Sequence, residues 1–326
     1  MPEPAFTLSE DTRHYLAYVP WRTILNWRRE EIKAGRRHKD SQSKPYAFAT
    51  RIGQAFKHLR NGDVIWIFTI PYYGKYGSFP TLNAMLVVED KVDRVAEQDR
   101  GRLAKVPPYF NTKGAQRQWR YIFFGNQATS RYFPINNCLE QLRPLLPAAT
   151  AQKLESGAPH GYGFLGMAFQ RARAISPEQG QQLFEFQQNL HKQKSLFISY
   201  RHREEPDLVG SIVEGLLQAG LVCWFDLNRI PPEVSKGVVE KPLEFFKEEL
   251  LQAVEACDGL LAIESDAYWK SYWTGLEYGA AQALSALKPG FRFFKAQLPL
   301  LDSEAERQKL IAIASQFHSF PIISEN

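Results

Sequence analysis

The sequence has no apolar run of the roughly 20 residues that a membrane-spanning helix needs. Its first 15 residues lack the basic flank and apolar stretch typical of a signal peptide. Cysteine is scarce, since the three cysteines (Cys138, Cys223 and Cys257) form no pair motif, and the seven histidines are dispersed. We therefore expect a reduced, cytoplasmic protein with no membrane partner and no zinc site.

Motifs of several large enzyme classes are also missing. No Walker loop, H-E-x-x-H, G-x-S-x-G or paired C-x-x-C motif occurs. GYGFLG (161–166) formally satisfies G-x-G-x-x-G, but a dinucleotide fingerprint follows a strand, and SGAPH precedes this stretch. We expect a glycine-rich loop here rather than a cofactor site.

Charge is unevenly distributed along the chain. Residues 1–190 hold 26 Lys/Arg against 16 Asp/Glu, and residues 191–326 hold 14 against 19, which together give the net charge of +5. A chain of 326 residues is long enough for two domains, and the charge difference suggests two modules with different partners. The basic excess of the front half fits a nucleic-acid surface and a merely solvated surface about equally.

Patterning predicts a compact α+β or small-barrel domain in the front half. We expect a domain at 1–176, a linker helix at 177–193 that begins with Ser176 as N-cap and Pro177 at N1, and an irregular excursion at 144–166. The expected strands are 14–21, 64–70, 82–92 and 119–126, and an amphipathic helix is expected over 46–63.

The back half alternates strands and helices. Strands are expected at 195–200, 221–226 and 259–265, and helices at 205–220, 242–258 and through Ala286. The nearly all-apolar strands favour a parallel sheet covered on both faces, in which ligands bind at the carboxyl ends of the strands. Those ends carry Ser199, Tyr200, Arg201, Asp226 and Ser265.

These strand ends carry a family resemblance over about residues 194–326. LFISYRHREE, GLVCWFD and CDGLLAIESDAYWKSYWTGLE, in this order, resemble a TIR (Toll/interleukin-1 receptor) domain of the bacterial type. The arrangement S-x5-S-x-W-x3-E adds to the match, with Ser265, Ser271, Trp273 and Glu277. The resemblance implies a flavodoxin-like sheet.

In enzymatic members of that family, NAD+ is cleaved between nicotinamide and ribose, and some members cyclise the product. The resemblance implies that Glu277 is the essential glutamate and that Ser199, Tyr200 and Arg201 border the nucleotide pocket. The segment after Asp226 corresponds to a loop that mediates assembly and gates the site. It has Pro-Pro where family members often have Pro-Gly, which leaves its contacts and the assembly mode open. Asp226 either joins the pocket or caps the following turn.

The chemistry also follows from the residues. Trp273 and Glu277 stand at i and i+4 and share a helix face, and Gly275 and Gly279 would allow close approach. Nicotinamide leaves NAD+ as a neutral base, so a single carboxylate that stabilises the oxocarbenium-like transition state suffices. Trp273 and Tyr200 are candidates to stack on the bases, and Arg201 to pair with the diphosphate. We expect Tyr268 and Trp269 in the core. The alternative is that Glu277 has only a structural role among aromatic residues of the core.

The front half resembles the PUA-like superfamily, including EVE and YTH-type domains, through HYLAYVPW, GDVIWIFTIP, LNAMLVVEDKV and GMAFQRARAIS. Members hold a modified nucleobase between aromatic side chains. The resemblance suggests Trp21, Trp27 and Tyr72 for a base pocket and Arg28, Arg29 and Arg173 among the candidate phosphate contacts, whereas Trp66 is expected in the core.

Three functions stay open at this point. The first is an NAD+ nucleosidase that takes NAD+ as substrate without a resident cofactor, self-associates through the TIR domain, and acts in bacterial antiviral defence under a front-half sensor. Nucleic acid or a nucleotide would be its trigger. The second is a TIR scaffold or signalling adaptor, and the third is a nucleic-acid-binding protein whose TIR domain only oligomerises.

Overall fold

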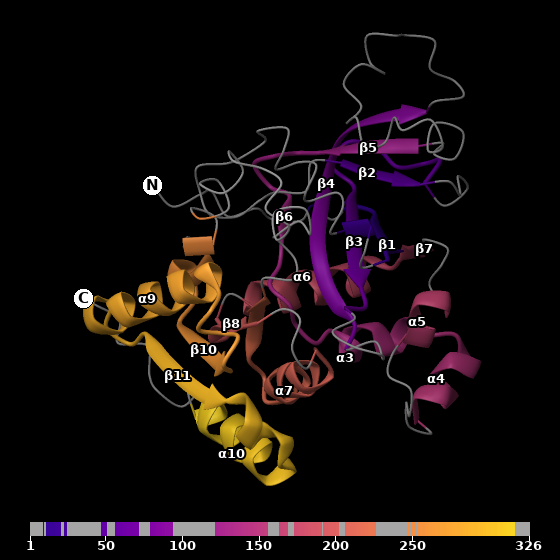
Figure 1. Ribbon diagram of the computed structural model, residues 1–326. Coiled ribbons are helices and arrows are strands. Elements are labelled where there is room, and N and C mark those ends of the chain that lie inside the picture. Colours follow the sequence, from indigo (N-terminus) through magenta and orange to yellow (C-terminus); the bar gives the residue numbers. More distant parts are fainter. Residues whose placement is uncertain are drawn as a thin grey trace, which may run out of the picture. The chain divides into compact units, whose positions relative to one another are not determined.

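A computed structural model describes residues 9, 11–20, 23–24, 47–50, 56–71, 79–93, 121–155, 163–168, 173–190, 192–201, 206–225, 247, 250–251 and 253–316. The chain forms two compact units (Figure 1). Unit 1 comprises Met1–Ile70, Pro80–Phe133 and Cys138–Gln188, and unit 2 comprises Pro71–Phe79, Pro134–Asn137 and Asn189–Asn326. No helix among the described residues has both the length and the apolar character to span a membrane.

Unit 1 is built on a mixed sheet of seven described strands. They are β1 (His14–Tyr18), β2 (Ala47–Thr50), β3 (Val64–Thr69), β4 (Thr81–Asp93), β5 (Tyr121–Gly125), β6 (Arg131–Tyr132) and β7 (Arg173–Ile175). The order is β2-β5-β4-β3-β1-β7, with β6 also paired to β4. Only β1 and β3 run parallel, since the remaining pairs are antiparallel. The strands predicted within 14–21, 64–70, 82–92 and 119–126 are confirmed as β1, β3, β4 and β5.

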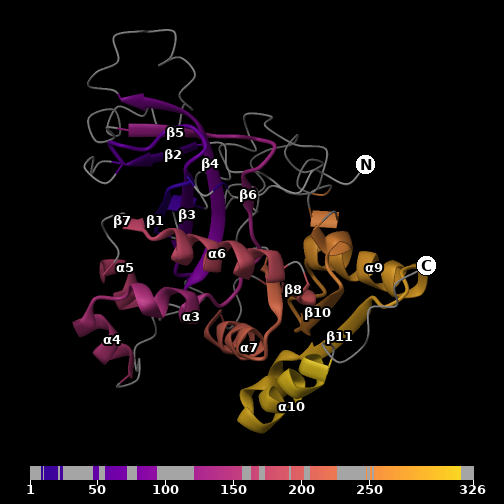
Figure 2. The ribbon, with the colours of Figure 1, turned by 180° about the vertical axis from the view of Figure 1, so that it is seen from behind.

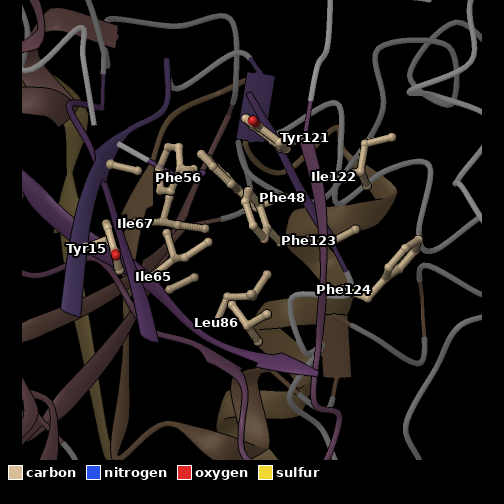
Figure 3. Packing of buried hydrophobic residues seen from close by; sticks show 14 of the residues in the cluster. Tyr15, Phe48, Phe56, Ile65, Ile67, Leu86, Tyr121, Ile122, Phe123 and Phe124 are labelled. Atoms are coloured by element: carbon tan, nitrogen blue, oxygen red, sulfur yellow. The ribbon is translucent and has the colours of Figure 1, made fainter. Parts of the chain in front are cut away.

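The sheet closes over an aromatic core (Figure 3). Phe56 packs against Phe48 and Phe123 with ring centroids 5.5 Å apart in each pair. The helix predicted over 46–63 is wrong for Ala47–Thr50, which pairs antiparallel with β5. Alternation of Ala47, Phe48 and Ala49 suits a strand once β5 supplies a partner, and tertiary pairing then overrides the local helical pattern.

Four described helices lie between β6 and β7 in the chain, and a fifth follows β7 and leads into unit 2. They are α3 (Leu139–Leu142), η2 (Arg143–Leu145), α4 (Ala148–Glu155), α5 (Gly163–Ala168) and α6 (Pro177–Leu190). The irregular excursion predicted over 144–166 is therefore wrong, because α4 and α5 lie in it. Gly166 of GYGFLG serves packing, because a Cβ there would lie 2.6 Å from the ring of Tyr18.

Helix α6 begins where the sequence predicts. The Ser176 Oγ accepts a hydrogen bond from the Gln179 N–H at 3.2 Å, and the Gln179 Oε1 accepts one from the Ser176 N–H at 3.0 Å. This reciprocal capping box satisfies two backbone donors at the start of the helix, with Pro177 at N1.

Unit 2 is a parallel α/β sheet. Its described elements are β8 (Ser195–Tyr200), α7 (Pro206–Gln218), β9 (Val222–Phe225), β10 (Gly259–Glu264), α9 (Tyr272–Leu287), β11 (Arg292–Gln297), η5 (Leu298–Asp302) and α10 (Glu304–Ser315). The strand order is β11-β10-β8-β9, with every pair parallel. Within unit 2, α9 packs on β8, β10 and β11, and α7 packs on α10 (Figure 2). This topology confirms the predicted flavodoxin-like sheet.

One short stretch from the front half of the sequence belongs to unit 2. Ile135 forms a β-bridge with Cys223 of β9, in which each residue donates its N–H to the carbonyl of the other at 3.0 Å. The chain is fixed on both sides of this stretch, because Phe133 donates to Asn83 at 2.8 Å and Cys138 to Pro80 at 2.9 Å. We call Pro134–Asn137 the edge strap, since it covers part of the outer edge of β9.

Candidate active site

A buried polar cluster lies at the carboxyl end of β8, on the side of the sheet that α9 covers. Its members are Ser199, Tyr268 and Glu277, from β8, the turn after β10 and α9 respectively. Ser199 and Glu277 are each 1% exposed. Such a concentration of polar groups in an otherwise apolar interface is uncommon, because buried polar groups need hydrogen-bond partners.

The turn after β10 places Tyr268. The Ser265 Oγ accepts a hydrogen bond from the Tyr268 N–H at 3.0 Å. Thr274 on α9 donates its hydroxyl to the Tyr268 carbonyl, which ties the turn to the helix. Ser265 thus shapes the turn, and Ser271 is the N-cap of α9 without a side-chain capping bond.

The cluster forms a chain of hydrogen bonds that ends on the carboxylate. The Ser199 Oγ donates to the Glu277 Oε2. It also lies 2.8 Å from the Tyr268 hydroxyl, and because its single proton is committed to Glu277, Tyr268 is the donor of that pair. Burial raises the pKa of Tyr268, the bond to Ser199 opposes that rise, and the charges of Glu277 and Glu264 add to it. Tyr268 therefore remains a protonated donor at neutral pH.

The aromatic residues of the turn before α9, and the glycines of α9, differ in part from the sequence prediction. Tyr268 is in the core as expected, but Trp269 is 54% exposed, so the prediction of a core Trp269 is wrong. Trp273 is half-buried and packs against the core cluster beneath α9. Gly275 and Gly279 do not mark a close approach, because a Cβ on either would meet nothing within 4 Å. Both lie on the exposed face of α9, away from Glu277.

The other predicted residues of unit 2 do not join this cluster in the structure, and one of them lies outside the described residues. Tyr200 is buried, and because side chains alternate along a strand, it lies on the opposite face of the sheet from Ser199. Arg201 is half-buried directly after β8. Asp226 falls outside the described residues. Of the predicted set, the structure brings Ser199 and Glu277 into direct contact.

Most front-half candidates fall outside the described residues, namely Trp21, Trp27, Arg28, Arg29 and Tyr72. Trp66 is fully buried, which confirms its predicted place in the core. Arg173 donates to the carbonyls of Leu145 at 2.9 Å and Ala168 at 3.1 Å, and so holds the α-helical part of unit 1 together.

A pocket of about 330 Å³ in unit 1 surrounds the turn Asn61–Asp63. Two charged side chains of this pocket are already paired, because Arg13 forms a salt bridge with Asp63 at 2.7 Å. The backbone N–H of Arg60 donates to the same carboxylate at 2.7 Å. The bond to Asp63 raises the pKa of Arg13. The pair anchors the turn rather than marking a binding site. Among the described residues, no group of three His, Cys, Asp or Glu side chains could hold a metal ion.

Comparison with known proteins agrees with the geometry of unit 2. A search of curated proteins found no match to the chain. The family model of the TIR domain matches residues 196–314, which run from β8 into α10 and include Ser199, Tyr268 and Glu277. The parallel order β11-β10-β8-β9 is consistent with the flavodoxin-like fold of a TIR domain. Residues 196–314 of the chain therefore form a TIR domain.

Proposed function

We propose that the TIR domain is an NAD+ nucleosidase with Glu277 as its catalytic carboxylate. TIR domains include NAD+-cleaving enzymes as well as signalling modules, and they commonly self-associate. The observation that carries the proposal is the Tyr268–Ser199–Glu277 chain of hydrogen bonds at the carboxyl end of a parallel sheet. Glutamate is seldom fully buried unless it is paired, and here the Ser199 hydroxyl, itself bonded to the Tyr268 hydroxyl, donates to the carboxylate.

In the proposed reaction, the bond between the ribose C1′ and the pyridinium nitrogen breaks. Its electron pair neutralises the pyridinium, so nicotinamide leaves without a general acid. Water adds to C1′ and gives ADP-ribose and one proton, whereas attack by a group of the same molecule would give a cyclic product. Glu277 stabilises the developing positive charge on the ribose, and Ser199 orients the carboxylate for that task.

The near-complete burial of Glu277 supports control by assembly. A carboxylate that is 1% exposed needs a rearrangement before a ribose can reach it. We propose that self-association of the TIR domain provides this rearrangement, under the control of the basic front half. Phage or modified nucleic acid would be the trigger in bacterial antiviral defence.

The same burial also favours a second candidate. In a TIR scaffold or adaptor, the three-residue cluster would join α9 to β8, and Glu277 would have only a structural role. A third reading, in which the protein binds nucleic acid and the TIR domain only oligomerises, shares that structural role.

Nicotinamide release from NAD+ distinguishes these functions. The full chain would be incubated with NAD+, with and without DNA or RNA, and Glu277→Gln compared with the wild type. We expect Glu277→Gln to lower the rate at least 100-fold, because the transition state loses a full negative charge. Glu255→Gln, an exposed carboxylate before β10, is the matched control and should leave the rate unchanged.

The outcome can contradict the proposal in two ways. Release that persists in Glu277→Gln would remove Glu277 from the mechanism. Absence of release under every nucleic-acid and crowding condition, with the protein folded, would favour the scaffold.

A further inference from the structure

A second carboxylate lies beside the cluster and takes no part in it. Glu264 is the last residue of β10, at the carboxyl edge of the sheet. In the strand register, Ala262 is opposite Ser199, and Tyr200 is opposite Ile263. Because side chains alternate along a strand, Glu264 is on the same face as Ala262 and Ser199. It therefore lies on the α9 side of the sheet, as Glu277 does.

One oxygen of Glu264 accepts no hydrogen bond from the part of the chain that the structure describes. Its Oε1 is buried and receives no hydrogen bond within the described structure. The cation on the neighbouring strand is engaged elsewhere: Lys295, whose Nζ lies 4.8 Å from the centroid of the Tyr278 ring, makes no ion pair with Glu264 among the described contacts. Its contact with Tyr278 is also the chief cause of its raised pKa, to which Glu264 adds only a smaller contribution. A buried carboxylate oxygen without a donor costs free energy that a ligand donor would recover.

Three aromatic rings pack in series in the turn that follows Glu264 and on α9. Tyr268 and Trp269 have centroids 5.3 Å apart, and Trp269 and Tyr278 have centroids 4.8 Å apart. Trp269, 54% exposed, is available for stacking with a planar ring. The charges of Glu277 and Glu264 both raise the pKa of Tyr268.

We propose that Glu264 is a substrate-binding carboxylate that accepts a hydrogen bond from the carboxamide of the nicotinamide ring. The proposal rests on the proposed function, in which Glu277 faces the ribose. The pyridinium ring is joined directly to that ribose, so a second carboxylate beside the first meets the ring and its substituent. The negative charge of Glu264 also favours the cationic ring before cleavage, which assigns it to binding more than to the chemical step.

The substituent of the ring provides a direct test. Nicotinic acid adenine dinucleotide carries a carboxylate in place of the carboxamide, so it offers no N–H donor and brings a like charge toward Glu264. The dissociation constants of NAD+ and of this analogue would be measured by titration calorimetry. The protein would be the full chain carrying Glu277→Gln, with and without Glu264→Gln, so that no turnover disturbs the measurement.

We expect Glu264→Gln to weaken NAD+ binding about tenfold, as loss of a charge-assisted hydrogen bond does. The same change should strengthen binding of the analogue, so the preference for NAD+ falls more than tenfold. In the wild-type background, Glu264→Gln should raise KM about tenfold and change kcat less than threefold. Asp266→Asn removes one exposed charge two residues away and should leave the preference within twofold.

An unchanged preference in Glu264→Gln, with NAD+ bound and nicotinamide release dependent on Glu277, would overturn this inference and leave the proposed function standing. Binding of NAD+ that depends on Glu264, without any nicotinamide release, would overturn the proposed function and leave the binding role of Glu264 standing. Absence of NAD+ binding to the folded chain under every trigger would overturn both.

Discussion

Two buried side chains, one in each unit, show how a polar group is held in an apolar interior. In unit 2, Ser199 links the Tyr268 hydroxyl to the Glu277 carboxylate. In unit 1, His14 lies between β3 and α6, where its Nδ1 accepts a hydrogen bond from the Trp66 Nε1 at 3.2 Å. A Cβ on Gly180 of α6 would lie 2.2 Å from the His14 ring, so the helix packs directly on the imidazole. The bond from Trp66 requires a His14 imidazole that is neutral at Nδ1.

The neutral state of His14 predicts a pH dependence of stability. Burial lowers the pKa of His14 below its usual 6.5. Below pH 6.5 the unfolded chain therefore binds a proton that the folded chain does not, and stability falls as the pH decreases. Protonation would also remove the acceptor of the Trp66 bond.

We expect His14→Gln to lose this contribution to the pH slope, which amounts to at most about 1.4 kcal/mol for each pH unit below 6.5. Melting temperatures at pH 7.5 and pH 5.5 would measure it. The exposed His58, changed to Gln, is the control. Equal slopes in the wild type and in His14→Gln would contradict the assignment.

At the scale of elements, the capping box of α6 predicts a cost for its removal. Ser176→Ala leaves the Gln179 N–H without its side-chain acceptor, and we expect a loss of about 1 kcal/mol in the free energy of unfolding of unit 1. Urea unfolding followed by circular dichroism would measure it. Ser211→Ala in the interior of α7, where the hydroxyl only donates to the Leu208 carbonyl, should cost less. A larger loss in Ser211→Ala would contradict the role of the cap.

Elements with a strong local pattern could be predicted from the sequence, and elements that depend on a distant partner could not. The nearly all-apolar run of β8 and the cap at Ser176 are local, and both are confirmed. Strand β2 forms by pairing with β5, which is distant in the sequence. No element is predicted for residues 287–326. There the edge strand β11 is largely exposed and lacks a buried face of its own.

The same distinction applies to the candidate site. Glu277 stands out among aromatics in the sequence, but Tyr268 and Glu264 do not. Tyr268 joins the cluster through its hydroxyl from a core position, and composition alone cannot separate that role from packing. The placement of Glu264 follows from the register of β10 against β8, which only the paired strands define.

At the scale of the whole molecule, the edge strap predicts local protection of β9. Ile135→Pro removes the N–H that Ile135 donates to Cys223. We expect the Cys223 amide, which the strap also binds, to exchange its hydrogen at least tenfold faster in that variant. Hydrogen exchange read by mass spectrometry would measure this in the full chain. Ile135→Val keeps both backbone bonds and should preserve the protection, and equal exchange in the two variants would contradict the role of the strap.

The edge strap also determines how the TIR domain can be studied alone. A fragment that begins at Asn189 contains all the described strands of the sheet, but it lacks Pro134–Asn137 and so leaves Cys223 of β9 without its bridge. Open sheet edges recruit strands from other chains. Self-association of such a fragment would then reflect the exposed edge of β9 as well as any interface of the TIR domain itself. Oligomeric states of this protein are therefore best compared with the edge strap retained.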